Sequence, residues 1–440
     1  MKPTSKRSRC LSKYVLVVPN PSGTHATLFN LRTGLAARVS WSVGKELAGG
    51  SVEAVAARFR PEESRRFFLQ EFCIPSDLRE TDDMLASLAA KRIDTKAVAV
   101  TFAPGMGCNM SCPYCFIAGS QHPPIADEPV MRSLKHWISQ LIEATVPNRF
   151  RLAFYGGEPL LYIRHIRQLV SQATRSAHAI GASCDVYIST NGSLLTECDI
   201  RSVSALCDDL ELQVTLDGPP AVHNARRPLR NGGDSFRSVL AGVRAAVRST
   251  RLRVRVNVDV QNVASIPYLF DILVQEGICP PADVMLWPTQ HTVVEQDHCK
   301  QYVGSYADSA VWLSGLWEEM ATRGIRPYGK CPLPGLCMRM HAYSFAVGAD
   351  GFIYRCTGEI GINEEPLGHV ADERVGDVLG SVELFSLRDV CTECQFLAIC
   401  AGGCTVQPRP QSTHADGGCE LHTFYSMTYG PFLNARWGQE

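Results

Sequence analysis

The chain has 440 residues, a formal net charge of -1 at pH 7 and a pI near 6.9. Its length predicts two or three domains, and its near-zero charge argues against nucleic acid or an anionic membrane as a partner, because both attract clustered positive charge. No apolar run reaches about 18 residues and no continuous apolar segment lies near the start, so we expect no membrane span, no export and a cytoplasmic location. The 18 cysteines are then expected to stay reduced, as metal ligands or buried thiols.

Residues 1–95 are predicted to form a small winged-helix-like module. The runs YVLVV and ATLFNLRTGLAARV are typical of short strands, with Thr33 and Gly34 at a hairpin turn. Three helical patterns follow, at residues 51–59, 61–72 and 77–91.

Residues 96–295 alternate between strands and helices. Strand-like runs lie at residues 97–102, 150–155, 184–190, 210–216, 251–258 and 283–287. Helical patterns lie between them, at residues 129–145, 162–179, 194–207, 235–248 and 263–276. Six βα repeats predict a parallel sheet with the functional residues at the carboxyl ends of its strands. Because the block is too short for eight repeats, the predicted fold class is α/β with a partial (β/α)6 barrel of the TIM type.

A helical connection is expected at residues 296–330, and the composition changes after it. Eight of the 18 cysteines lie between residues 331 and 421, where Gly and Pro are abundant and long periodicity is weak. A segment with so thin an apolar core is usually stabilised by metal. We therefore predict an irregular, cysteine-rich domain at residues 331–440.

The stretch CNMSCPYCF, at residues 108–116, follows the first strand of the repeat block. Its cysteines, Cys108, Cys112 and Cys115, have C-x3-C-x2-C spacing, and thiolates are soft ligands that suit iron–sulfur clusters or zinc. A closed structural site needs four ligands, whereas a catalytic site leaves one metal position open. Three cysteines thus predict an open site; a zinc site completed by a distant ligand such as His122 is the alternative.

This loop resembles the cysteine motif of the radical S-adenosylmethionine (SAM) enzymes, with Tyr114 at their aromatic position. The resemblance implies a [4Fe-4S] cluster on the three cysteines, whose fourth iron is chelated by the amino and carboxylate groups of SAM. It also implies reductive cleavage of SAM to a 5′-deoxyadenosyl radical, which abstracts hydrogen from an unactivated C–H bond of the substrate.

Motifs at the next strand ends support the resemblance. YGGEP (155–159) resembles the GGE motif, whose glycines let the backbone approach SAM and whose glutamate accepts a hydrogen bond from the SAM ammonium group. STNG (189–192) and TLDG (215–218) lie where related enzymes contact the ribose and the carboxylate, although both could be ordinary turns. The SAM contacts implied by these motifs are Gly156, Gly157, Glu158, Ser189, Asn191 and Thr215.

Residues 217–236 show no regular period and read as a long functional loop. Within it His223 and Arg227 resemble the family's HDxxR-like segment, which implies that Arg227 pairs with the SAM carboxylate. The neighbouring Arg226 is an equally basic rival.

The cysteines after residue 330 resemble, position by position, the SPASM extension of radical SAM enzymes. The resemblance implies two auxiliary [4Fe-4S] clusters with four cysteines each, so that the chain would carry three clusters. The first would use Cys331, Cys337, Cys356 and Cys404, and the second Cys391, Cys394, Cys400 and Cys419. Two structural zinc ions would use the same thiolates. The remaining cysteines show no ligand spacing and are predicted to be buried thiols: Cys10, Cys73, Cys184, Cys198, Cys207, Cys279 and Cys299.

The resemblance implies an oxidoreductase that modifies a ribosomally made precursor peptide and takes electrons from a reductant such as flavodoxin or ferredoxin. The N-terminal module resembles leader-peptide recognition elements, which bind by strand addition. Two fully ligated auxiliary clusters favour loss of an electron by the substrate radical, hence a carbon–carbon or thioether cross-link over redox-neutral epimerisation.

The runner-up is an anaerobic sulfatase-maturase-like enzyme that forms formylglycine. Those enzymes carry an acidic residue where this chain has Thr357, although Asp350 or Glu359 could substitute. An electron-transfer or zinc scaffold without catalysis does not explain the open cysteine loop beside GGEP.

Overall fold

The computed structural model describes residues 8–56, 62, 70–115, 117, 125–289, 302, 304–329, 337–360, 366–372, 374–382, 387, 389–404 and 419–437. Some sequence predictions lie wholly or partly outside these residues. They concern the end of the helix at 51–59, most of the helix at 61–72, the start of the connection at 296–330, His122, Cys299 and Cys331.

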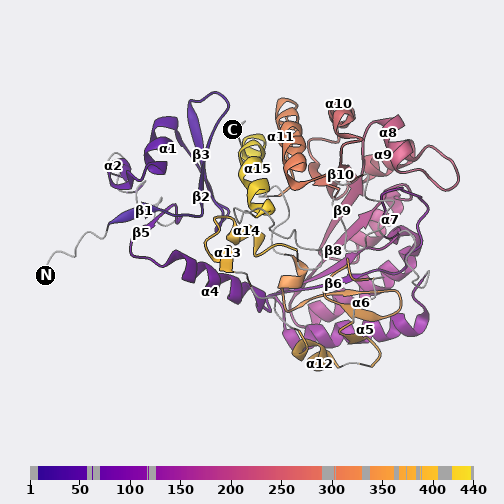
Figure 1. Cartoon of the computed structure of the whole chain (residues 1–440). Helices are drawn as coiled ribbons and strands as arrows, with labels where there is room; N and C mark the ends of the chain where they lie inside the picture. Colours follow the sequence, from indigo (N-terminus) through magenta and orange to yellow (C-terminus); the bar gives the residue numbers. More distant parts are fainter. Residues whose placement is uncertain are drawn as a thin grey trace.

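The core is a parallel sheet in which six consecutive strands lie side by side (Figure 1). The strands are β6 (Ala97–Phe102), β7 (Arg149–Phe154), β8 (Ser183–Thr190), β9 (Asp209–Thr215), β10 (Arg251–Val258) and β11 (Asp283–Pro288). Each is hydrogen-bonded to the next in parallel register. The predicted α/β fold with a partial (β/α)6 barrel is therefore confirmed.

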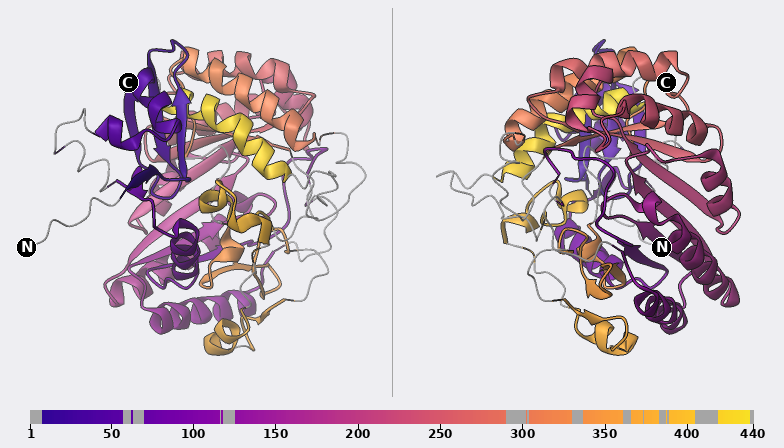
Figure 2. Two further views of the ribbon diagram at one scale, coloured as in Figure 1. Left: turned by 60° about the vertical axis from the view of Figure 1, so that its left-hand side comes forward. Right: turned by 90° about the vertical axis from the view of Figure 1, so that its right-hand side faces the viewer.

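Helices cover the outer face of this sheet (Figures 1 and 2). They are α5 (Glu128–Thr145), α6 (Ile163–Ala179), α7 (Glu197–Ser204), α9 (Ser235–Val247) and α10 (Ile266–Gln275), with 3-10 turns at η1 (Pro159–Tyr162) and η2 (Val263–Ser265). In β8, buried residues alternate with partly exposed ones, as expected for a strand that packs against helices on one face. In the described part of the chain, no helix combines the length and apolar character that crossing a bilayer requires.

The sheet continues beyond the six predicted strands. β12 (Ser344–Val347) pairs in parallel with β6, and β13 (Phe352–Tyr354) and β14 (Gly368–His369) extend it in antiparallel register, giving nine strands in one sheet. The sequence did not indicate these strands because they are two to four residues long, too short to show a period. Part of the cysteine-rich segment is thus an extension of the barrel sheet.

The N-terminal module has a three-stranded antiparallel sheet of β2 (Val15–Pro19), β3 (His25–Asn30) and β4 (Ala36–Ser40). Thr33 and Gly34 lie in the connection of β3 to β4, where Gly34 has a φ of 69°. Around it lie α1 (Trp41–Ala48), α2 (Val52–Ala56), α4 (Glu80–Arg92) and the pair β1 (Arg9–Leu11) and β5 (Cys73–Pro75). The sequence prediction missed α1, which Ser40 caps by accepting a hydrogen bond from the Val43 amide at 3.4 Å.

The C-terminal helix α15 (Glu420–Trp437) links this module to the barrel (Figures 1 and 2). It lies along α11 (Tyr306–Thr322), where Trp317 and Phe432 meet edge to face at 5.3 Å. On its other side Trp437 lies 5.4 Å from Phe29 of β3, measured between ring centroids. The remaining elements are short: η4 (Met338–Met340), α12 (Val375–Gly380), α13 (Asp389–Thr392) and α14 (Leu397–Cys400).

Candidate active site at the carboxyl ends of the strands

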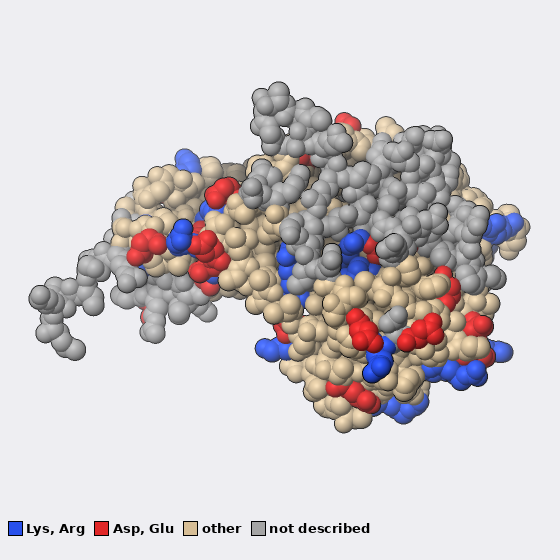
Figure 3. Space-filling model, turned by 60° about the horizontal axis from the view of Figure 1, so that its bottom comes forward, with Lys and Arg blue, Asp and Glu red and all other residues tan. Residues whose placement is uncertain are grey.

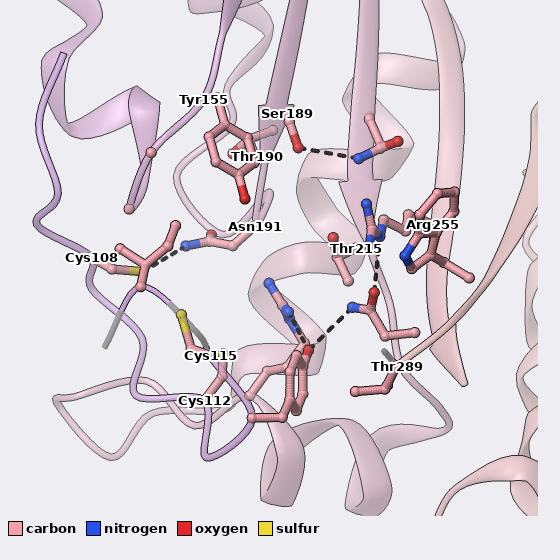
Figure 4. Close-up of a pocket in the computed structure, with 18 of the residues that line it drawn as sticks. Cys108, Cys112, Cys115, Tyr155, Ser189, Thr190, Asn191, Thr215, Arg255 and Thr289 are labelled. Carbon is pink, nitrogen blue, oxygen red and sulfur yellow. Dashed lines mark hydrogen bonds between the residues drawn. The ribbon is translucent and has the colours of Figure 1, made fainter. Parts of the chain in front are cut away.

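A cavity of about 270 Å³ opens at the carboxyl ends of β7 to β11 (Figure 4). The cysteine loop forms one wall, and residues from successive strand ends form the others. Of the residues predicted from sequence as site residues of the barrel, those that line it are Cys108, Cys112, Tyr114, Cys115, Gly156, Gly157, Ser189, Asn191, Thr215 and Arg227. Glu158 is the exception.

The cysteine loop is held by the segment after α8 (Pro220–Arg226). The Ser111 amide donates to the Pro228 carbonyl at 2.9 Å, and Arg230 Nε donates to the Cys108 carbonyl at 2.9 Å. Burial raises the pKa of the Cys112 thiol to about 11, so without metal it stays protonated. In the described part of the chain no three His, Cys, Asp or Glu side chains converge closely enough to bind a single metal ion. In a cluster, by contrast, each thiolate binds a different iron, and three thiols spread around one cavity suit that group.

Glycine is required at positions 156 and 157 by the packing of the protein backbone. A Cβ on Gly157 would lie 2.2 Å from the Gly107 carbonyl oxygen, and one on Gly156 would lie 2.6 Å from that of Gly105. The absent side chains therefore let the loop before Cys108 pass against the end of β7. The sequence interpretation had assigned this closeness to SAM alone, whereas the backbone of the chain itself requires it.

Glu158 is fully buried and does not line the cavity. Its carboxylate accepts hydrogen bonds from Thr190 Oγ1 at 2.6 Å, the Asn191 amide at 2.7 Å and the Leu160 amide at 3.0 Å. Burial raises its pKa, and these hydrogen bonds oppose the rise. In this arrangement Glu158 positions the STNG turn, and its contact with the SAM ammonium group stays a prediction.

Asn191 and Ser189 reach the cavity from the end of β8. Asn191 Nδ2 donates to Asn109 Oδ1 at 2.8 Å and lies 3.8 Å from Cys108 Sγ, so it connects the turn to the cysteine loop. Ser189 Oγ accepts a hydrogen bond from Gln213 at 3.1 Å. Both side chains, with Thr215, provide the polar wall that a ribose or amino acid group would contact.

Arg227 belongs to a buried network with Tyr114 and Asp217. Its Nη1 donates to the Tyr114 hydroxyl at 2.5 Å, which in turn donates to Asp217, and Arg227 lies 3.8 Å from Asp217 Oδ2. Burial alone would lower the pKa of Arg227, but Tyr114, Cys112 and Asp217 raise it well above its usual range. Arg227 is a permanent cation at the cysteine wall, as binding a carboxylate requires.

Arg226, the other candidate for the SAM carboxylate, is bound to another residue. It forms a bidentate ion pair with the fully buried Asp259, at 3.1 and 2.6 Å, and does not line the cavity. The prediction of an irregular loop at 217–236 was partly wrong, because residues 220–226 form α8; two turns are too few to show a helical period. His223 is buried in it and accepts a hydrogen bond from the Asp217 amide at 3.2 Å.

Sequence reasoning missed several residues that line the cavity: Tyr155, Gln213, Arg255, Asn257, Trp287 and Thr289. All lie at or near the carboxyl ends of predicted strands, so strand position was the available signal. Arg255 was overlooked because alternation in RLRVRVNV is also typical of an ordinary half-exposed strand.

The described cysteines of the C-terminal segment lie near one another in two sets, Cys337 with Cys356 and Cys404, and Cys391 with Cys394, Cys400 and Cys419. Burial and then the neighbouring Cys337 and Cys404 raise the pKa of Cys356 to about 11. Burial and then Cys419, Cys394 and Cys391 raise that of Cys400 to about 12. All seven described members are free thiols. The buried carboxylate of Glu359 fixes the first group by accepting a hydrogen bond from the Cys356 amide at 3.0 Å and pairing with Arg339.

A partial barrel with three cysteine thiols around a cavity at the carboxyl ends of its strands is typical of barrel enzymes that bind a metal cluster. Residues 102–260 match the Radical SAM superfamily. The chain therefore contains a radical SAM domain over these residues. It is 21% identical over 367 residues to the cysteine-type anaerobic sulfatase-maturating enzyme of Clostridium perfringens, covering 74% of this chain and 92% of the relative. It is 22% identical over 384 residues to the serine-type enzyme of Bacteroides thetaiotaomicron, covering 75% and 88%.

Two solved structures share the fold. Native anSMEcpe with bound AdoMet and the Kp18Cys peptide superposes with a TM-score of 0.61 at 18% identity, covering 78% of this chain and 98% of that one. Streptococcus suis SuiB bound to its precursor peptide SuiA gives a TM-score of 0.52 at 15% identity, covering 91% and 96%.

Proposed function

We propose that the chain is a radical SAM maturase of the SPASM type, which modifies a ribosomally made precursor peptide. The observation that carries this proposal is the cavity whose wall holds Cys108, Cys112 and Cys115 and whose other walls are polar strand ends. Relatives of the same fold have been solved with AdoMet and with peptides, which supports a peptide substrate.

The residues around the cavity fit the absent cofactors. The three thiols would hold the cluster, Arg227 would hold the carboxylate of SAM, and Ser189, Asn191 and Thr215 would contact its polar groups. When bound, cluster and SAM supply a radical that takes hydrogen from a C–H bond. The protein orients the peptide and keeps bulk water out, for which Tyr114, buried between the cysteines and Asp217, forms part of the wall.

Two auxiliary clusters on the C-terminal cysteines would remove the second electron from the substrate. The seven described thiols fall into the two expected groups, which supports this assignment. If the substrate carbon bonds to a second carbon or to a thiol of the same peptide, the step releases this electron and one proton, so we propose an intrapeptide carbon–carbon or thioether bond as the product.

Formylglycine formation is the second candidate, because the sulfatase-maturating relatives cover most of this chain. That reaction needs a base at the substrate hydroxyl or thiol. Glu359 is occupied by Arg339 and two amides, and no Asp or Glu among the described residues lines the cavity. These contacts favour the cross-link.

The test is an anaerobic reaction of the reconstituted enzyme with SAM, reductant and the short peptide encoded beside its gene, followed by mass spectrometry in deuterated water. Loss of two hydrogens without deuterium at carbon supports a cross-link, which fragmentation would locate. Conversion of Ser or Cys to an aldehyde would establish formylglycine formation, and unchanged composition with one deuterium at an α-carbon would establish epimerisation. Cys112→Ala should abolish SAM cleavage in every case.

We further propose that residues 14–95 bind the leader segment of that peptide by strand addition. β2 faces α15, whereas β4 is the other edge of the three-stranded sheet. The amides of Trp41 and, by alternation, Val39 and Ala37 point toward β3, so the Ala36 amide points outward. Ala36→Pro should weaken peptide binding at least tenfold, whereas Ala36→Ser keeps the amide and should bind within about twofold. Equal affinities would contradict strand addition at this edge.

A further inference from the structure

Four buried or partly buried arginines of the described residues lie inside the barrel or at its mouth, and three of them have a carboxylate partner. Arg226 pairs with Asp259 at 2.6 Å, Arg227 lies 3.8 Å from Asp217, and Arg253 pairs with Glu211. The fourth, Arg255, forms no ion pair with any carboxylate in the described part of the chain. Figure 3 shows both acidic and basic side chains on this face of the molecule, with basic ones also gathered in the hollow at its centre.

Arg255 is held in place by neutral groups. Its Nε donates to Asn257 Oδ1 at 2.9 Å, and its guanidinium lies 5.0 Å from the centre of the Trp287 ring. Its two terminal amino groups have no acceptor among the described residues, and neither is enclosed by protein. Two donors of a fixed fork therefore face the cavity.

A desolvated cation without a counter-ion is unfavourable, and burial lowers the pKa of Arg255 accordingly. The neighbour two residues earlier on the same face of β10 shows the usual solution. Arg253 is bonded to Glu211 and stacked on Tyr328 at 3.4 Å. An anionic ligand in the cavity would complete the pairing that Arg255 lacks.

The position of Arg255 indicates which ligand this is. In Figure 4 it enters the cavity from β10, across from the three cysteines. Arg227, by contrast, is hydrogen-bonded to Tyr114 of the cysteine loop and lies where the cofactor would be held. Arg255 therefore faces the part of the cavity that is left for the substrate.

We propose that Arg255 binds a carboxylate of the peptide substrate and so determines which residue is presented for hydrogen abstraction. The planar guanidinium matches a carboxylate through two parallel hydrogen bonds, which a lysine would not reproduce. This inference rests on the proposed function. The carboxylate belongs either to an Asp or Glu side chain or to the peptide C-terminus.

The experiment measures the affinity of the full-length, cluster-loaded enzyme for the peptide encoded beside its gene, by fluorescence anisotropy without reductant. In one arm each Asp or Glu of the peptide is replaced in turn by Asn or Gln, and in the other its C-terminus is amidated. We expect one replacement, or the amidation, to weaken binding to the wild type by about 10- to 100-fold. Binding to Arg255→Gln should be weak and insensitive to the same change.

The control is the pair Arg253→Gln with Glu211→Gln, which removes the neighbouring ion pair; Arg151, which also pairs with Glu211 at 2.9 Å, is exposed and stays solvated. This double variant should still bind the unmodified peptide more tightly than the peptide in which the carboxylate is replaced by an amide. The inference is overturned if Arg255→Gln weakens all peptides equally, or if it changes the affinity for SAM instead. If no peptide binds the wild type, while SAM is still cleaved, the proposed function itself has failed.

Discussion

The barrel and the cysteine-rich segment of the same chain are stabilised in different ways. In the barrel, strands of six to eight residues pack against helices such as α5, which buries seven of its residues against the sheet. The segment after residue 337 has strands of two to four residues and helices such as α13 and α14 of four. Isolated helices that short are unstable, so the cysteines have to provide what apolar burial does not.

Metal removal should have the largest effect and should separate the two regions. We expect loss of the clusters to lower amide exchange protection at residues 389–404 by about a thousandfold or more, because metal binding there is folding energy. Amide exchange protection in β6 to β11 should change by less than about tenfold when the clusters are lost. Hydrogen exchange with mass spectrometry before and after anaerobic chelation measures both, and an equal loss in the two regions would contradict the distinction.

Trp137→Ala tests the apolar side of the comparison. Trp137 of α5 is 1% exposed and meets Phe345 of β12 edge to face at 5.5 Å. Removing this side chain should cost about 3–5 kcal/mol of unfolding free energy through lost burial and a cavity. Urea unfolding measures the loss, and iron content should be unchanged in the variant that still folds. Trp137→Phe, which keeps most of the volume, is the matched control.

Acid stability should depend on His223. Burial lowers its pKa to about 3, whereas the unfolded chain has a pKa near 6.5, so the unfolded state alone takes up a proton between these values. The neutral, buried His223 therefore adds fully to the free energy of unfolding above about pH 6.5, and this term falls by about 1.4 kcal/mol per pH unit below that pH.

His223→Asn keeps an acceptor for the Asp217 amide but removes the titration. Between pH 7 and pH 5 the free energy of unfolding, measured with urea, should fall by about 2 kcal/mol less in the variant than in the wild type. Identical losses in the two proteins would show that His223 does not titrate on unfolding.

The smallest effect concerns a helix cap in the barrel. The Asp127 carboxylate accepts a hydrogen bond from the Val130 amide at 2.9 Å at the start of α5. Asp127→Ala should cost about 1 kcal/mol, and Asp127→Ser should recover most of it. Thermal unfolding of the three proteins provides the measurement, and no difference between Ala and Ser would exclude capping as the cause.

The sequence predicted the barrel because its strands and helices are long enough to show a period, as in β8 and α5. It also placed the cysteine wall, since cysteine spacing is a local signal. It did not predict β12 or the unpaired state of Arg255, because both depend on what lies beside them in space. Glu158 shows the same limit: the motif located the residue, but only the fold shows that its carboxylate faces the STNG turn.

The helix α15 has a consequence for synthesis on the ribosome. Phe29 of the first module packs against Trp437 and Tyr429, which lie more than 390 residues later in the chain. Domains usually fold as they emerge, N-terminal first. Here Phe29 stays without its aromatic partners until Tyr429 and Trp437 have been synthesised, and the first module exposes an apolar surface that can aggregate during that interval.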